Sequence, residues 1–423
     1  MSKKTYRERL CDAELQLALS ASGAVLIEGA KWCGKTSTAS HASKSAVYMQ
    51  DPDTAIANLA MADTKPSLLL KGETPRLLDE WHVAPVLWDA VRFTVDQRGE
   101  RGQFILTGSA VPPDNLTSHT GTGRISRLKM RPMSLFESME SNGTVSLQAL
   151  FDQRAEGIAV NSELTIEQIA FLICRGGWPA SIGSTGNIAL RMATDYVEAI
   201  IHQDVSRVDG IEKNPERVRL LLRSLSRNLS TMASQETILK DIEATDVSIS
   251  PKTLSGYLNA LRRIFVIEDL PAWQPSLRSK TAIRTSEKRH FVDPSIATAV
   301  MRMNPDGLLN DFPYFGFLFE SLCTRDMRIY AQAIDGDVFH YRDKSGLESD
   351  MIVRLRDGRW AAIEVKMGQK EIEEAAANLI KLNQMIDEEK MGKASFLMII
   401  TGGQYAYQRK DGVWVVPLGC LRN

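Results

Sequence analysis

The first third of the chain alternates short apolar runs with amphipathic stretches. Each apolar run has the length of a buried β-strand, and segments with helical spacing of apolar residues separate the runs. Strands that alternate with helices are typical of a parallel sheet with crossover helices. We therefore predict an α/β unit over residues 1–140, with strands at GAVLIEGA, SAVYMQD, RLLDEW and GQFILTGSA.

The middle of the chain has a helical pattern. Residues 141–210 are predicted to be helical except at RGGWPA, where two glycines and a proline interrupt the pattern. Residues 211–285 contain short amphipathic helices. There, SQETILKDI followed by ISPKTLSGYLNALRRIFVIEDLPAW has the order of a helix-turn-helix and a wing-like strand. Such a module binds DNA in many proteins and serves protein interaction at least as often.

A basic stretch, PSLRSKTAIRTSEKR, precedes a second α/β unit at residues 286–423. We predict this stretch to be a linker or loop. Its basic side chains could contact a phosphate backbone, although such a charge run is more often only solvated; they are Arg278, Lys280, Arg284, Lys288 and Arg289. In the following unit, helices are predicted at FGFLFESLC and KEIEEAAANLIKLNQMI, and strands at RIYAQ, DVFHYRD, SDMIVRLRD, WAAIEVKM and ASFLMIITG.

The length, net charge, apolar runs and cysteines of the chain exclude some classes of protein. A length of 423 residues predicts several domains, and a net charge of −1 excludes a global basic field, so any nucleic-acid binding must use a local patch. No apolar run approaches the roughly 20 residues that cross a bilayer, and the charged start MSKKTYRERL lacks a secretory apolar core. The five cysteines are scattered. We expect a reduced, cytoplasmic protein without a membrane partner.

The segment GAKWCGKT fits the phosphate-binding pattern G-x-x-x-x-G-K-[ST] and follows a predicted strand. Glycines let backbone N–H groups approach phosphate oxygens, and the next helix presents its positive end. Lys35 would contact the β- and γ-phosphates, and Thr36 would bind Mg²⁺. We therefore predict ATP and Mg²⁺ as cofactors; the predicted cofactor-binding residues are Gly29, Ala30, Lys31, Trp32, Cys33, Gly34, Lys35, Thr36 and Ser37.

Three further elements follow the P-loop in the order expected of an NTPase. At the end of RLLDE, Asp79 would orient Mg²⁺ and Glu80 would polarise the attacking water. The strand FILTGS ends in Thr107, Gly108 and Ser109. A polar side chain there, such as that of Ser109, could reach the γ-phosphate or the attacking water, or this could be a plain strand-to-loop turn. In GRISRLKMRP, Arg124 is the candidate arginine finger, in the same chain or from a neighbour, and a basic surface loop is the alternative.

These motifs together resemble the prokaryotic AAA-type ATPases with a C-terminal domain of unknown function. The likeness covers nearly the whole chain and includes GGWP at residues 176–179 and HQDV at residues 202–205. PMSLFE replaces the family's PLSF-E, and the apolar run before Asp79 is shorter than usual. The resemblance implies an AAA-type P-loop ATPase core at 1–140, a helical lid at 141–210, a winged helix at 211–285 and a nuclease-like domain at 286–423.

The last domain carries a second set of polar residues. Asp350 begins one predicted strand, and Glu364 and Lys366 are two apart on the next, so the latter two share one face. Asp350 and Glu364 could hold a metal ion that, with Lys366, activates water. This D…E-x-K pattern resembles the PD-(D/E)xK nuclease core, and Glu320 matches that fold's helix acid. The alternative is ordinary ionisable residues on exposed strands.

Three functions remain open from the sequence. The first is a Mg²⁺-dependent ATPase of AAA type coupled to a winged helix and a PD-(D/E)xK-like domain, with DNA as the candidate partner. The second is a nucleotide-gated regulatory or interaction protein without nuclease chemistry, with a protein partner. The third is a nuclease that its ATPase part only controls. AAA cores often form rings, so an oligomer is a candidate state for each.

Overall fold

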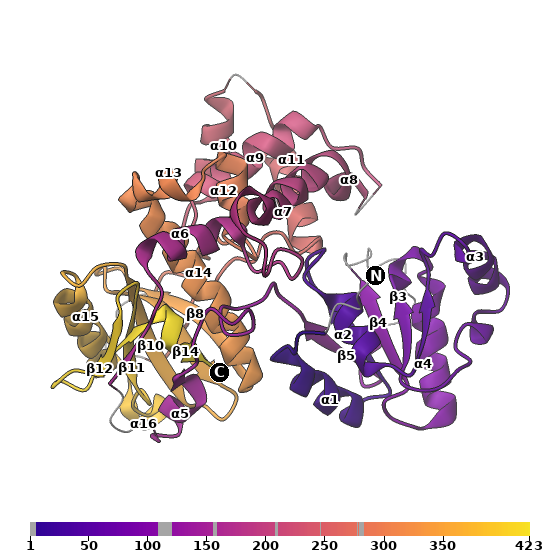
Figure 1. Cartoon of the computed structure of the whole chain (residues 1–423), viewed down its shortest axis with the longest axis horizontal. Helices are drawn as coiled ribbons and strands as arrows, with labels where there is room; N and C mark the ends of the chain where they lie inside the picture. Colours follow the sequence, from indigo (N-terminus) through magenta and orange to yellow (C-terminus); the bar gives the residue numbers. More distant parts are fainter. Residues whose placement is uncertain are drawn as a thin grey trace. The chain divides into compact units, whose positions relative to one another are not determined.

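The computed structural model describes residues 6–108, 121–154, 159–207, 210–245, 247–276, 278 and 283–423 (Figure 1). The chain divides into two compact units. Unit 1 comprises Met1–Pro132, His202–Lys213 and Asn259–Val266, and unit 2 comprises Met133–Ile201, Asn214–Leu258 and Ile267–Asn423. None of the helices in the described part of the chain is long and apolar enough to cross a membrane.

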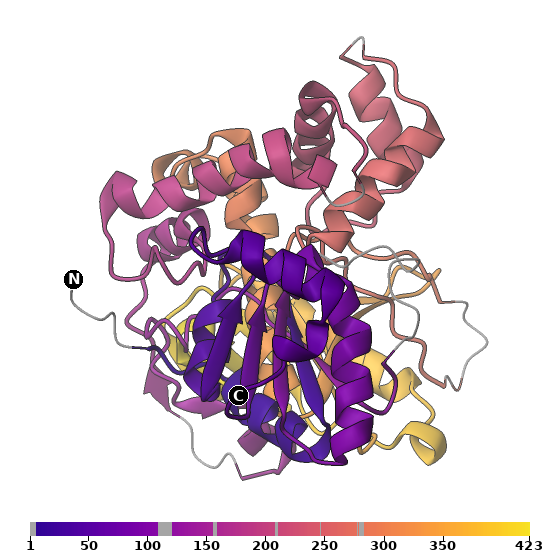
Figure 2. The same ribbon diagram turned by 90° about the vertical axis from the view of Figure 1, so that its right-hand side faces the viewer.

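Unit 1 is built on a parallel five-stranded sheet with the order β2-β3-β4-β1-β5. Figure 2 looks onto this unit, whose strands run side by side. The strands are β1 (Ala24–Glu28), β2 (Ser45–Tyr48), β3 (Arg76–Asp79), β4 (Phe104–Gly108) and β5 (Ile125–Lys129), and the helices are α1 (Cys11–Ala21), α2 (Lys35–Ala42), α3 (Ala55–Thr64) and α4 (Val86–Arg98). The predicted α/β unit with a parallel sheet is confirmed.

Both faces of this sheet are covered, which explains why its strands are continuously apolar. On β1, Leu26 belongs to a core cluster that includes α4, whereas Val25 and Ile27 belong to a second cluster that includes α1. Successive residues of a strand point to opposite faces, so one short run serves both cores. Burial on both faces fixes the strand ends, and the nucleotide-binding loop follows one of them.

The first part of unit 2 is mostly helical, as the pattern predicts. Its elements are α5 (Leu147–Phe151), α6 (Ile166–Arg175), α7 (Gly186–Ala199), α9 (Pro215–Arg227), α10 (Gln235–Glu243), α12 (Ser295–Met301), α13 (Pro305–Leu309), β6 (Val145–Ser146) and β7 (Val160–Asn161). The π-helical turn at Ile200–Asp204, α8 (Val205–Arg207) and the end of α11 (Pro251–Arg263) lead into the short segments that cluster with unit 1.

The rest of unit 2 is a mixed seven-stranded sheet in the order β7-β12-β13-β11-β10-β9-β8, with α14 and α15 packed on its strands. Its further elements are α14 (Phe312–Ala333), β8 (Gly336–Arg342), β9 (Glu348–Leu355), β10 (Trp360–Lys366), α15 (Ile372–Met385), α16 (Glu388–Met391), β11 (Leu397–Thr401), β12 (Tyr405–Gln408), β13 (Trp414–Pro417) and β14 (Leu421–Arg422). The neighbouring strands β9 and β10 pair antiparallel.

Two predictions for unit 2 are wrong. RIYAQ is not a strand but the end of α14, because this stretch of the helix is buried on every side and shows no polar stripe. The basic stretch is not wholly a solvated loop either. Lys288 and Arg289 lie on a short backbone ladder, with Lys288 paired to Leu270, and both side chains are largely buried in ion pairs.

The RGGWPA segment is a packing element of unit 2. Gly177 donates its N–H to Asp293 (2.9 Å) and accepts a hydrogen bond from the Met133 N–H (2.7 Å). The Asp293 carboxylate is in turn held by the fully buried Arg325 guanidinium (2.9 Å). A Cβ built at Gly177 would overlap the Met133 carbonyl oxygen. Glycine is therefore required here by the close approach of another backbone.

Gly177→Ala is expected to lower the free energy of unfolding of unit 2 by roughly 1–3 kcal/mol, because the Met133 backbone must move. Gly316→Ala is the matched control, since a Cβ at that position of α14 meets nothing within 4 Å. It should be neutral or stabilise by about 0.5–1 kcal/mol. Urea unfolding followed by tryptophan fluorescence measures both. Equal stability of the two variants would contradict the packing role.

Candidate functional site

The loop between β1 and α2 has the shape of a phosphate cradle. Gly34 adopts a left-handed conformation (φ 108°) directly before α2, and a Cβ on Gly29 would overlap the Met130 carbonyl oxygen. Both glycines are therefore needed for the loop's path. The first N–H groups of α2, which have no partner within the helix, open onto this loop and make it suited to an anion.

The reactive side chains of the loop are held by its own backbone and by a neighbouring strand. The Lys35 ammonium is buried and donates to the carbonyls of Gly29 (2.9 Å) and Ala30 (2.8 Å). The Thr36 hydroxyl donates to the Asp79 carboxylate at the end of β3 (2.8 Å). The structure thus brings the predicted Mg²⁺ residues into direct contact.

A third strand joins this network. β4 lies between β1 and β3, and its Thr107 donates to the same Asp79 oxygen (2.6 Å). The Thr107 hydroxyl also accepts the Glu80 N–H (3.2 Å). Thr107 therefore fixes the Asp79 carboxylate and the backbone of Glu80 at once. The sequence predicted that a polar side chain at this strand end, which includes Thr107 and Ser109, reaches the site; Ser109 lies outside the described residues.

Glu80 stands in a strained conformation that aims it away from the strand. Its φ of 55° is in the left-handed region that non-glycine residues rarely adopt. His82 Nδ1 lies 3.2 Å from the Glu80 carboxylate. Burial lowers the pKa of His82, against the opposing charge of Glu80. Neutral His82 therefore lies beside Glu80 without a hydrogen bond from Nδ1 to its carboxylate.

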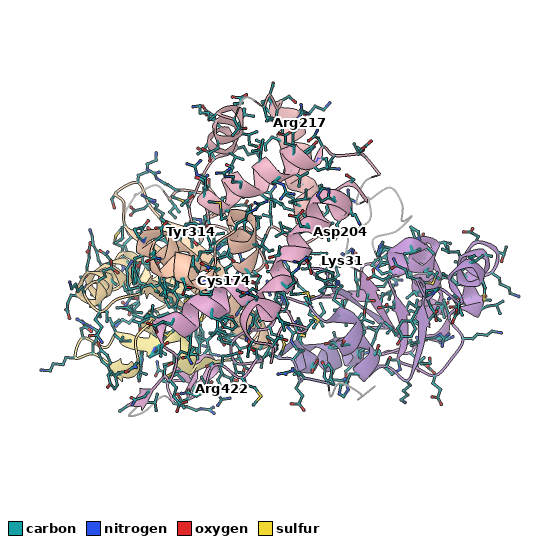
Figure 3. All side chains as sticks on the ribbon, turned by 45° about the horizontal axis from the view of Figure 1, so that its top comes forward. Lys31, Cys174, Asp204, Arg217, Tyr314 and Arg422 are labelled. Atoms are coloured by element: carbon teal, nitrogen blue, oxygen red, sulfur yellow. The ribbon has the colours of Figure 1, made fainter. Side chains whose placement is uncertain are left out.

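Two contacts that sequence reasoning missed hold the loop from outside. The buried Arg9 guanidinium donates to the Cys33 carbonyl (2.9 Å) and the Arg131 carbonyl (2.8 Å), and no sequence signal marks it. Lys31 forms an ion pair with Asp204 (2.8 Å), and Figure 3 shows the two side by side. The HQDV run contained Asp204, but only as part of the family resemblance.

The candidate arginine finger is not at the nucleotide loop of its own chain. Arg124 immediately precedes β5 and pairs with Asp96 of α4 (2.8 Å). Its carbonyl accepts the N–H of Ala24, the first residue of β1, whereas the P-loop follows the last residue of that strand. The strand geometry therefore argues against Arg124 as an arginine finger for the nucleotide site of its own chain. Only a role toward a neighbouring copy stays open as a proposal.

The residues of the loop fit a magnesium nucleotide. The loop leaves no room for a Cβ at Gly29. The Thr36 hydroxyl and the Asp79 carboxylate are in contact, and both present oxygen atoms, which are the ligands that Mg²⁺ prefers. Bound ATP would supply the phosphate charge that Lys35 and the start of α2 are placed to bind.

The predicted polar residues of unit 2 also come together, with one addition. Asp350 accepts the Val365 N–H (3.0 Å), and Glu364 pairs with Lys366 (3.1 Å). Lys288 lies between Glu320 and Asp350, with its ammonium 2.8 Å and 2.9 Å from their carboxylates. Sequence reasoning missed Lys288 because it belongs to the supposed linker.

Burial and the neighbouring charges together shift the pKa values of the carboxyl groups in this cluster. Burial raises the pKa of Glu320 to about 7, against the opposing charge of Lys288. Burial would also raise the pKa of Asp350, but Lys288 and Lys366 hold it at about 2. Burial and the charge of Asp350 raise the pKa of Glu364 well above its ordinary value.

The cluster does not fit a divalent metal as it stands. Both Asp350 oxygens are engaged, one by Lys288 and the other by the Val365 N–H, and one Glu364 oxygen is engaged by Lys366. Within the described residues, no group of three or more His, Cys, Asp or Glu side chains is arranged to hold a metal ion. No catalytic step through a metal is therefore derived for this domain.

Three family models match successive parts of the chain, and the first of these parts contains the nucleotide-binding loop. Residues 21–139 match an AAA domain, residues 166–307 a domain of unknown function (DUF8612), and residues 315–421 another domain of unknown function (DUF4143). No curated protein matches the chain. The AAA match and the P-loop geometry support an ATP-binding ATPase domain of AAA type at residues 21–139. This chain joins that ATPase domain to the two domains of unknown function.

Solved structures show only distant likeness. The Walker-type ATPase PABY2304 of Pyrococcus abyssi is 12% identical, with a TM-score of 0.41 over 71% of this chain and 97% of that chain. The STAND protein PH0952 of Pyrococcus horikoshii, with a tetratricopeptide repeat sensor, is 14% identical (TM-score 0.24; 78% and 49%). Drosophila ORC bound to DNA is 11% identical (0.17; 71% and 89%). At TM-scores this low, the likeness establishes neither a shared fold nor a shared function.

Thr107→Val is expected to lower kcat for ATP roughly 10–100-fold, because Asp79 and Glu80 each lose a hydrogen bond that positions them. The KM for ATP should change little, since Thr107 does not line the phosphate loop. Steady-state phosphate release measures both constants. Thr64→Val, at the exposed end of α3, is the matched control. An unchanged kcat in Thr107→Val would contradict the positioning role.

Proposed function

We propose that this protein is a Mg²⁺-dependent ATPase in which one network of three strands organises hydrolysis. The observation that carries the proposal is the hydrogen bond from Thr36 to Asp79 (2.8 Å), which joins the P-loop to the acidic strand end. In P-loop ATPases such a hydroxyl and carboxylate hold Mg²⁺ between them. Thr107 supports it by fixing Asp79 and the backbone of Glu80.

Each residue has a separate role in the proposed reaction. Lys35 leaves its two carbonyl partners and binds the β- and γ-phosphates, which Mg²⁺ helps to neutralise. Glu80, whose backbone N–H is held by Thr107, orients and polarises the attacking water. Ser37 and the loop residues from Gly29 to Gly34 contribute backbone and hydroxyl donors. An arginine such as Arg124 would act only if a neighbouring copy supplied it.

Two variants should separate ATP binding from ATP hydrolysis. Lys35→Ala is expected to abolish both, because the phosphates lose their buried positive charge. Glu80→Gln should keep ATP affinity and lower kcat by roughly 10²–10⁴-fold. Fluorescent-nucleotide titration and phosphate release measure the two effects. Lys44→Ala, an exposed lysine just beyond α2, is the matched control. Normal hydrolysis by Lys35→Ala would refute the proposal.

We infer further that residues 211–285 act as a winged helix and that ATP turnover controls a DNA-binding state. In support, α10 and α11 are joined by a short segment, and the chain then forms the ladder of Ile267 with Phe291 and Leu270 with Lys288. α10 begins with a side-chain cap from Ser234 and carries its apolar residues on one face. The C-terminal domain, proposed to have a PD-(D/E)xK-like fold, would serve as a binding module.

Lys252→Glu is expected to weaken binding to duplex DNA roughly three- to tenfold, because this exposed lysine lies in the first turn of α11, the candidate recognition helix. Lys381→Glu on α15 makes the same charge change elsewhere and should have little effect. Fluorescence anisotropy with and without ATP measures the affinity. If neither native protein nor either variant bound DNA, the protein-interaction alternative would replace DNA binding.

A further inference from the structure

The acidic cluster of unit 2 contains a cation that belongs to the chain itself. The Lys288 ammonium lies 2.8 Å from the Glu320 carboxylate and 2.9 Å from the Asp350 carboxylate, and all three side chains are nearly buried. Asp350 is one of the two carboxylates that the nuclease-like pattern assigns to a metal ion, and Glu320 matches the helix acid of that fold. The distances are those of charge-assisted hydrogen bonds, so the ammonium fills the space between the two acids.

The position of Lys288 is fixed by its backbone as well as its side chain. Its N–H donates to the Leu270 carbonyl (3.0 Å), and its carbonyl accepts the Leu270 N–H (2.8 Å). Two residues further on, the His290 carbonyl accepts the Glu268 N–H (2.9 Å). The lysine therefore lies on a paired strand segment that runs into the fold.

Lys288 occupies the position from which a cation would contact these carboxylates. One Asp350 oxygen accepts from Lys288 and the other from the Val365 N–H, and one Glu320 oxygen accepts from Lys288. Glu364 pairs one oxygen with Lys366, and its other oxygen, Oε1, is buried without a hydrogen-bond partner among the described residues. A divalent cation would have to displace the Lys288 ammonium to bridge Asp350 and Glu320.

Charge balance leads to the same conclusion. The three carboxyl groups face two ammonium groups, so at most one formal negative charge is uncompensated. A buried site that takes Mg²⁺ out of water needs more than that. We propose that Lys288 takes the place of the metal ion in the C-terminal domain, which makes the cluster a metal-free structural centre instead of a nuclease site. This inference does not depend on the proposed ATPase mechanism.

The test is Mn²⁺ binding to the nucleotide-free full-length protein, measured by electron paramagnetic resonance. Native protein and Glu364→Gln should bind the same amount of Mn²⁺, because the native cluster holds none. Lys288→Met keeps the length of the side chain and removes its charge. It should bind one additional Mn²⁺ per chain, and the added ion should disappear in Lys288→Met/Glu364→Gln.

Lys366→Met is the matched control, because it also removes one ammonium group but leaves Lys288 in place. It should gain no Mn²⁺, and Mn²⁺ should raise the melting temperature of Lys288→Met alone. If Lys288→Met does not fold, the comparison of native protein with Glu364→Gln decides, and equal Mn²⁺ binding supports the proposal.

Any of four results would overturn the proposal that Lys288 replaces the metal ion. The first is native Mn²⁺ binding that Glu364→Gln abolishes. The second is a folded Lys288→Met that gains no Mn²⁺, and another is a Lys366→Met that gains as much Mn²⁺ as Lys288→Met is expected to gain. The last is Mn²⁺-dependent cleavage of DNA by the native protein that is lost in Asp350→Asn. ATP hydrolysis is measured separately, so failure of the ATPase proposal would not be mistaken for any of these.

Discussion

The order of strands in the unit 1 sheet is the constraint on which the nucleotide site depends. β4 pairs with both β1 and β3, so a single strand separates the P-loop from the acidic strand end. In a parallel sheet all strands end at one edge. Thr36 and Asp79, 43 residues apart, therefore meet in a hydrogen bond, and Thr107 reaches them from between.

The two units use the same residue types for different purposes. In unit 1, Lys35 and Asp79 are held by neutral partners, the loop carbonyls and two threonine hydroxyls, which phosphate and Mg²⁺ can replace. In unit 2, Lys288 and Arg325 face buried carboxylates directly. Removing one member of a buried ion pair leaves an uncompensated charge that costs about 3–5 kcal/mol. The first arrangement suits exchange with a ligand, and the second suits a fixed structure.

Sequence reasoning was most successful where the physical requirement is local. The P-loop requires glycines, a lysine and a hydroxyl within one short segment, so its residues could be predicted from their spacing alone. Reasoning failed at RIYAQ, because a helix buried on all sides carries no amphipathic period. It failed again at Lys288, because a basic residue in a polar stretch gives no sign that its strand pairs with Leu270 and enters the core.

The sequence by itself determined the class of the first unit and the residues of its phosphate loop, since backbone conformation and anion chemistry act over a few neighbouring residues. Only the tertiary structure decided that Thr107 donates to the Asp79 carboxylate, that Arg124 lies away from the loop of its own chain, and that Lys288 occupies the acidic cluster. Those contacts join residues far apart in the chain, and their energies depend on burial, which no local pattern of residues reports.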